Sequence, residues 1–103
     1  MANPERGEVD AEIGGKTYTL CLTLGALAEL EARLGDGDLQ SLGQRLAAGR
    51  LSARDLIAIL GAGLRGGGHP ISNAELERLS VKGGITGAAE IAVTLLLRAF
   101  GED

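Results

Sequence analysis

The sequence predicts an α+β fold, in which an N-terminal two-stranded β-hairpin is followed by a compact bundle of four to five helices. Apolar and polar residues alternate on both sides of Gly14-Gly15, and this pattern indicates a hairpin. From Thr23 onward the apolar spacing becomes helical. Although 45% of the residues are hydrophobic, only Tyr18 and Phe100 are aromatic. The core must therefore be aliphatic, which favours packed helices over a β-sandwich. We expect a single domain over residues 1–103.

The hairpin is expected over about residues 8–23, with the paired glycines as its turn. Glycine adopts the positive φ that both central positions of a type I′ turn require. Because side chains alternate between the two faces of a strand, one face should be buried and the other more open. In the second strand the buried set is expected to be Tyr18, Leu20 and Leu22, and the open set Thr17, Thr19 and Cys21.

Helices are expected over about residues 24–100. The first runs from about Leu24 to Leu34, where Gly35 provides a C-cap. A turn at residues 36–38 follows, and its Asp38 caps a short helix that carries three leucines and reaches about Gly49.

Two later helices have well-specified starts. In each, a serine N-cap is followed three residues later by an acid: Ser52 by Asp55, and Ser72 by Glu75. Apolar residues flank both first turns, so each start reads as a capping box with a hydrophobic staple. The two helices are expected over about residues 53–64 and 73–81.

The closing helix, over about residues 86–100, has an unusually wide apolar surface. Its polar residues Glu90, Thr94 and Arg98 form one narrow stripe, which leaves an apolar arc of roughly 240° where an ordinary surface helix needs little more than 100°. Either this helix is central to the bundle, or its flank beside Glu90 meets another chain. Val93 and Leu97 on that flank are therefore candidate protein-interface residues. The core-facing residues are expected to be Ala88, Ala92, Leu96, Ala99 and Phe100.

The charge distribution argues against nucleic-acid binding and suggests a second candidate interface. The formal net charge is −4, whereas binding to nucleic acid needs clustered Lys and Arg. Within residues 40–70, however, four bases stand against Asp55 alone. Such a segment is either a solvated helix face or a surface for self-association with an acidic end of another copy. The bases are Arg45, Arg50, Arg54 and Arg65.

No residue pattern indicates an enzyme, a cofactor site or a metal site. Residues 61–66 match G-x-G-x-x-G, but a helix start precedes them and a Gly-Gly-His-Pro run follows. A dinucleotide site needs a strand before the glycines and a helix after them. His69 is the only histidine and Cys21 the only cysteine, so neither a metal cluster nor an internal disulfide is expected.

Hydropathy predicts neither a membrane span nor an export signal. The longest apolar segment, residues 85–100, is shorter than the roughly 20 residues that span a bilayer and contains Glu90 and Arg98. Residues 1–8 lack the apolar stretch of a signal peptide. We therefore expect a cytoplasmic protein without a membrane partner.

The chain resembles the small gene-transfer-agent and phage tail assembly chaperone family. The resemblance begins with the segment from Gly7 to Glu31, which includes Ile13-Gly14-Gly15-Lys16-Thr17-Tyr18 and Leu22-Thr23-Leu24-Gly25-Ala26-Leu27. It continues through the leucines of residues 39–46, the run from Asp55 to Leu64 and the closing apolar helix, and so covers nearly the whole chain. The shared features are structural, and the family has no known catalytic residues to carry over.

The resemblance implies a bacterial, non-catalytic chaperone that binds the long helical tape-measure protein, or another tail protein, while the tail tube polymerises. The apolar flank of the closing helix and the uneven charge leave a homo-oligomer open as well. An older interpretation of the family makes it a structural component of the tube. A tube subunit should be rich in strands that continue a sheet around a ring, which one hairpin and several helices fit poorly. The residues also leave open a protein-interaction module of unrelated role and a small-ligand enzyme.

Overall fold

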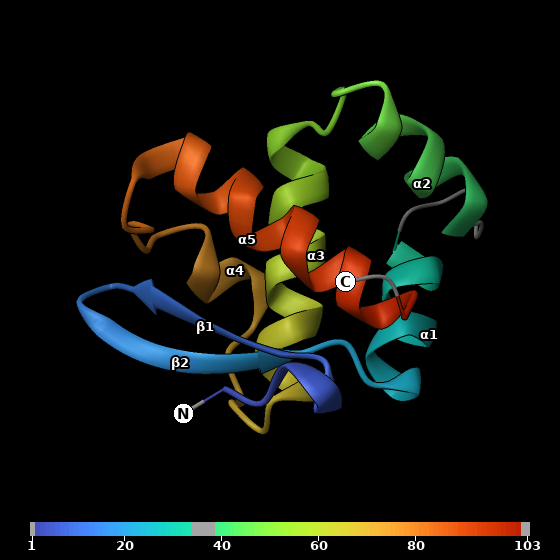
Figure 1. The fold of residues 1–103 in the computed structure, drawn as a ribbon. Coiled ribbons are helices and arrows are strands. Elements are labelled where there is room, and N and C mark those ends of the chain that lie inside the picture. Colours follow the sequence, from blue (N-terminus) through green and yellow to red (C-terminus); the bar gives the residue numbers. More distant parts are fainter. Residues whose placement is uncertain (1, 34–38, 102–103) are drawn as a thin grey trace.

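The structure, a computed structural model, describes residues 2–33 and 39–101 and has the predicted α+β architecture (Figure 1). The expected end of the first helix at Leu34, its C-cap Gly35, the turn at 36–38 and the N-cap Asp38 lie outside the described residues. The elements are a 3₁₀ turn η1 (Pro4–Arg6), strands β1 (Glu8–Ile13) and β2 (Lys16–Cys21), and helices α1 (Leu24–Arg33), α2 (Leu39–Ala47), α3 (Ala53–Gly66), α4 (Asn73–Leu76) and α5 (Gly84–Ala99).

The hairpin has the register that the alternation predicts. β1 and β2 pair antiparallel, with Val9 opposite Leu20. Gly14 and Gly15 form the turn with φ angles of 60° and 82°, as a type I′ turn requires. Leu20 is fully buried, whereas Cys21 on the opposite face is only partly buried. The predicted buried face is thus confirmed at Leu20 and Leu22, whereas Tyr18 is only partly buried, as is Thr19 of the predicted open face.

Residues 80–82 lie along the outer edge of β1. The amide of Gly14 donates to the carbonyl of Ser80 at 2.7 Å, and the amide of Lys82 donates to the carbonyl of Glu12 at 3.0 Å. At the start of the strand, the Arg98 side chain from α5 donates to the carbonyl of Glu8. Both ends of this edge are therefore bonded within the chain, at Glu8 and at residues 12–14.

The C-terminal end of α3 covers the other edge. Gly66 faces the carbonyl oxygen of Cys21 and Gly67 faces that of Thr19, so closely that a Cβ on either glycine would overlap the oxygen. Helix and strand can approach this far only because glycine has no side chain. Other parts of the chain thus occupy both ends of the β1 edge and residues 19–21 of the β2 edge.

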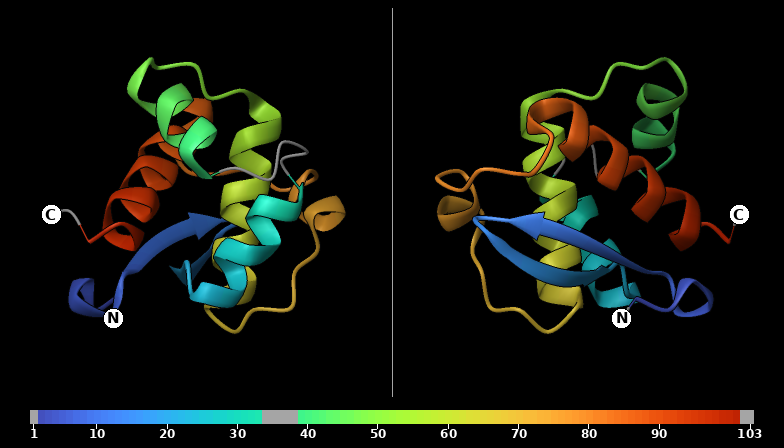
Figure 2. Two further views of the ribbon diagram at one scale, coloured as in Figure 1. Left: turned by 90° about the vertical axis from the view of Figure 1, so that its right-hand side faces the viewer. Right: turned by 60° about the vertical axis from the view of Figure 1, so that its left-hand side comes forward.

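α3 is the central helix, as Figures 1 and 2 show. It contacts β2, α1, α4 and α5. Its start at Ser52 carries the predicted capping box: the Ser52 hydroxyl accepts from the amide of Asp55, and the Asp55 carboxylate accepts from the amide of Ser52. Because neighbours surround this helix, Ile59, Ala62 and Leu64 have no exposed surface.

α4 is shorter than the sequence predicts. The capping box of Ser72 and Glu75 is present, but the helix ends at Leu76 and not near Val81. The reason is the pairing of residues 80–82 with β1, because backbone in a bridge to a strand cannot continue a helix. A tertiary contact therefore overrides the local apolar spacing.

α5 crosses the face of α3 and runs to the opposite side of the molecule (Figures 1 and 2). Ala88, Ala92 and Leu96 are buried as predicted, and Ala99 is partly buried against the core. The prediction for Phe100 is wrong, because 42% of this residue is exposed. It caps the helix at the surface, beyond the last turn that contacts the core.

α2 connects to α3 through a loop that leaves the helix at Gly49, with φ of 68°. Leu42 is fully buried and Leu46 packs against the core, so this helix also contributes an apolar face.

Among the described residues, no helix is both long and apolar enough to cross a membrane.

Candidate protein-interaction surface

Val93 and Leu97 lie one turn apart on the outward side of α5. Val93 is partly buried and is not among the residues that pack against the core, and Leu97 is 36% exposed. Glu90, one turn before Val93, is exposed. We call Glu90, Val93 and Leu97 the α5 outer face. It is accessible to another protein, whereas Leu95 and Leu96, on the inward side of the same helix, are fully buried.

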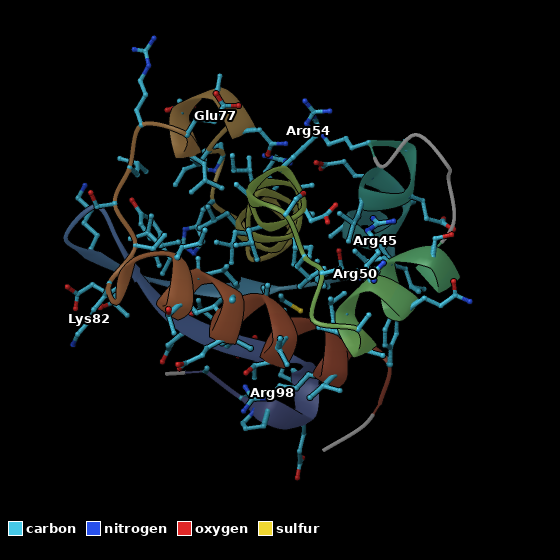
Figure 3. The ribbon with its side chains drawn as sticks, turned by 90° about the horizontal axis from the view of Figure 1, so that it is seen from above. Arg45, Arg50, Arg54, Glu77, Lys82 and Arg98 are labelled. Atoms are coloured by element: carbon cyan, nitrogen blue, oxygen red, sulfur yellow. The ribbon has the colours of Figure 1, made fainter. Side chains whose placement is uncertain are left out.

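The polar stripe predicted on this helix is divided between two environments. Glu90 is exposed, but the Thr94 hydroxyl donates to the Glu90 carbonyl at 2.9 Å, and Arg98 turns to the carbonyl of Glu8 on the hairpin. Arg98 therefore ties the helix to β1, and Figure 3 shows it beside the N-terminal segment. The helix therefore presents fewer polar side chains to solvent than the predicted stripe of three, because Thr94 and Arg98 are partly buried.

Two of the four candidate arginines are held in ion pairs inside the molecule. Arg45 of α2 lies 3.3 Å from the Asp55 carboxylate at the start of α3. Burial acts to raise the pKa of Asp55, but the hydrogen bonds from the Ser52 amide and from Arg45 outweigh it and lower that pKa. Arg45 thus joins two helices through the capping residue.

Arg65 has a similar structural role at the other end of α3. Its Nε donates to Glu29 of α1 at 3.0 Å, its Nη2 also contacts that carboxylate, and its Nη1 donates to the Ile71 carbonyl at 2.8 Å. The hydrogen bond from Arg65 is the main reason why the pKa of Glu29 is lowered. This bidentate pair connects α1, α3 and the loop before α4.

Arg50 and Arg54 remain exposed and point to solvent. Arg54 lines a shallow hollow of about 520 Å³ together with Arg33 and Glu77. Arg50 and Arg45 line a separate hollow beside α2. Figure 3 shows Arg45 and Arg50 close together, with Arg54 nearer Glu77. The structure does not bring the four predicted bases together as one surface.

An apolar groove of about 320 Å³ lies between α3, α4 and the first turns of α5. Leu56, Leu60 and Leu76 form its buried floor, with 5%, 2% and 4% of their surface exposed. Leu79 and Ile85 stand at its margin and are 38% and 68% exposed. We call this feature the α4–α5 groove. Sequence reasoning missed it because the groove arises where three distant segments meet.

The G-x-G-x-x-G match has a packing role. Residues 61–66 lie within α3, and a Cβ on Gly63 would lie 3.1–3.3 Å from side-chain atoms of Leu95 and Leu20. The glycines therefore let α5 and the hairpin approach the central helix.

Within residues 2–33 and 39–101, no group of three or more His, Cys, Asp or Glu could hold a metal ion. His69 packs edge-on against Tyr18, with ring centroids 4.9 Å apart.

The comparison with known protein families matches nearly the whole chain. The model of the family described as "Phage tail tube protein, GTA-gp10" matches residues 6–102, which include both strands and all of α1, α3 and α5. Neither a curated protein nor a solved structure gives a significant match. The match supports the predicted relationship to gene transfer agents and phage tails, and its wording names the tail tube and not a chaperone. The chain belongs to the family of phage tail tube proteins described as GTA-gp10.

Proposed function

We propose that this chain serves phage-like tail assembly as a chaperone that binds a long helical tail protein, such as the tape-measure protein, through the α5 outer face. The observation that carries the proposal is that both edges of the hairpin are engaged over part of their length by other segments of the chain. A subunit that built a tube wall by continuing a sheet would need a free strand edge to pair with its neighbour. In this chain both ends of the β1 edge, and residues 19–21 of the β2 edge, are already engaged by other segments.

The α5 outer face supplies the contact that the proposal needs. Leu97 and Val93 lie outside the core, and a partner helix with an apolar stripe can bury such side chains by packing against them. The nearby Glu90 is exposed and would remain at the margin of that contact. A modest apolar surface of this kind suits reversible binding, which a chaperone requires.

A structural component of the tail tube is the second candidate, and the wording of the family description favours it over the chaperone. In that case the chain would remain in finished tails in a fixed ratio to the other tube proteins. A chaperone would be absent from purified tails, or present far below that ratio. Quantitative mass spectrometry of purified tails distinguishes these two functions.

The contact is tested by the double variant Val93→Glu with Leu97→Lys, co-expressed with the tape-measure protein. Because Val93 is only partly buried and Leu97 is exposed, we expect a nearly unchanged circular dichroism spectrum and melting temperature. Co-purification of the tape-measure protein should be lost, since two charged side chains would replace the apolar contact and would have to lose their water against an apolar stripe, a cost that their own i,i+4 pairing only partly offsets.

The matched control is Arg50→Glu with Arg54→Glu, which changes two exposed positions away from α5. Normal binding by this control and loss of binding by the α5 variant would support the proposal. A folded α5 variant that still binds, with loss in the arginine variant, would place the contact on the basic segment. An α5 variant that unfolds would show that this flank belongs to the core.

A further inference from the structure

α2 is attached to the rest of the molecule less extensively than the other helices are. Among the described elements, each of the others lies close to at least one neighbour over several residues, whereas α2 does not. Figure 1 and the right-hand view of Figure 2 place α2 at the outer edge of the fold. Its 9 residues are fewer than the roughly 12–15 that an isolated helix needs in water, and Gly43 lowers its helix propensity further. α2 therefore depends on its contacts with the rest of the chain to remain helical.

Two leucines and one arginine provide these contacts. Leu42 is fully buried, and Leu46 is partly buried against the core. Arg45 reaches Asp55 at the start of α3, with its Nη2 at 3.3 Å and its Nε at 3.4 Å from the carboxylate oxygens. These distances exceed the roughly 2.7–2.9 Å of strong charge-assisted hydrogen bonds. Among the described residues, the backbone hydrogen bonds of α2 stay within residues 39–50, so side chains alone hold this helix in place.

The rest of the fold does not need α2 in order to stay assembled. α3 contacts β2, α1, α4 and α5 directly. At the start of α3, Asp55 keeps its hydrogen bonds with Ser52 when Arg45 leaves, so the capping box remains. Leu51, on the α3 side of the turn at Gly49, packs against the core. α2 can therefore detach up to Gly49 while the hairpin and the helices around α3 remain folded.

α2 itself shows which partner fits the surface that it covers. This surface, which we call the α2-binding surface, contacts Leu42, Arg45 and Leu46, and Asp55 lies beside it. The Asp55 side chain is only 11% exposed, and a carboxylate with so little access to water is stabilised by a base. Arg45 occupies this position although Arg50 lies close by (Figure 3), so the site admits a positive charge. The surface therefore suits an amphipathic helix with apolar residues at positions i and i+4 and a base at i+3.

We propose that α2 detaches as a unit and that the α2-binding surface then binds an amphipathic helix of this pattern from another protein. In the intact chain the site is open only part of the time, because the chain's own helix competes at a high effective concentration. The α2-binding surface is separate from the α5 outer face. The inference therefore goes beyond the proposed function, and its tests use no tail protein.

The first test measures detachment by native-state hydrogen exchange of the full chain. The amides of Leu46 and Ala47 report on α2, because they lie in its last turn. After correction for intrinsic rates, they should exchange about a hundredfold faster than the buried amides of α3, because local opening requires less free energy than global unfolding. Arg45→Gln should accelerate both reporters by about two- to fivefold and leave α3 unchanged.

Arg50→Gln is the matched control, because it removes the same charge from an exposed arginine close to Arg45. It should leave the exchange rates of α2 unchanged. Protection of α2 equal to that of α3 would overturn detachment. So would an effect of Arg45→Gln that is equally large throughout the chain, or one that Arg50→Gln reproduces.

The second test supplies a helix in trans. Leu42→Ser with Leu46→Ser should detach α2 and leave the remaining helices folded, as circular dichroism would show. A synthetic peptide of residues 39–50, with the wild-type sequence, is then titrated and followed by NMR shifts at the start of α3. We expect a Kd of about 0.1–1 mM for the variant, from an effective concentration in the millimolar range within the chain. The wild type should bind the peptide at least about tenfold more weakly, because its own α2 competes.

Two further peptides test the pattern. Arg45→Gln in the peptide should weaken binding by about two- to fivefold, and Leu42→Ser with Leu46→Ser in the peptide should abolish it. A folded double-leucine variant of the protein that binds no peptide would overturn the proposed binding site. Global unfolding of that variant would also overturn the inference, because α2 would then belong to the cooperative core.

Discussion

Two helical glycines, Gly43 and Gly66, differ in what surrounds them. Gly43 of α2 has open space where a side chain would begin. Gly66, at the end of α3, lies against the carbonyl of Cys21, and a Cβ there would also approach Ala26 at 3.1 Å. Gly43 thus only lowers the helix propensity of α2, whereas Gly66 is required for the close contact between α3 and the hairpin.

The same substitution should therefore have opposite effects at these two positions. Gly43→Ala should stabilise the protein by about 0.5–1 kcal/mol through helix propensity. Gly66→Ala should destabilise it by about 1–3 kcal/mol, because the backbone of β2 must move to make room. Chemical denaturation of both variants measures the difference. Equal effects of the same sign would show that α3 does not approach β2 as closely as described.

At the scale of elements, both predicted capping boxes are present, but they begin very different helices. Ser52 caps α3, which has 14 residues and contacts most of the other elements. Ser72 caps α4, which has four residues and ends where the chain pairs with β1. The local signal for a helix start is equally good in both cases. Only the contacts that follow decide how far each helix continues.

Removal of the two caps should consequently have unequal effects. Ser52→Ala should cost about 1 kcal/mol in the free energy of unfolding, because the Asp55 amide loses its acceptor at the start of the central helix. Ser72→Ala should cost less, about 0.5 kcal/mol, because α4 is only one turn long. Equilibrium denaturation provides both values. A larger loss at Ser72 than at Ser52 would contradict the central place assigned to α3.

At the scale of the whole molecule, ion pairs between helices make stability depend on pH. The pKa of Glu29 is lowered, chiefly by the hydrogen bond from Arg65, and the pKa of Asp55 is lowered despite its burial by Ser52 and Arg45. A carboxyl with a lowered pKa binds fewer protons in the folded state than in the unfolded one. Its contribution is present above the unfolded pKa of about 4 and is lost as pH falls through the folded pKa.

We expect the melting temperature to be nearly constant from about pH 7 to pH 5 and to fall below about pH 4. Glu29→Gln should lower it at pH 7 by roughly 4–8 °C, equivalent to about 1 kcal/mol for this partly exposed pair. The gap to the wild type should narrow as the pH falls through the lowered pKa of Glu29, since protonation then removes the charge from the wild type as well. Glu90→Gln, at an exposed position, is the control. A gap of constant size at every pH would exclude the ionic origin.

Much of this fold can be predicted from the sequence, because it depends on interactions between residues that are close together in the chain. The paired glycines specify the turn, the alternation specifies the hairpin register, and two serines with their acids specify helix starts, because each of these features acts over a few neighbouring residues. Helical spacing alone singles out Val93 and Leu97, and both do lie outside the core. Whether they bind a partner stays a prediction.

The tertiary structure decides what depends on residues far apart in the chain. It ends α4 early, because residues 80–82 pair with β1. In the folded chain Arg45 and Arg65 form ion pairs with acids of neighbouring helices, because packing brings those acids close. Arg50 and Arg54 stay exposed. The tertiary structure also leaves Phe100 at the surface and assembles the α4–α5 groove. Composition and periodicity carry no information about such long-range contacts, because these features arise only once the helices pack against the hairpin.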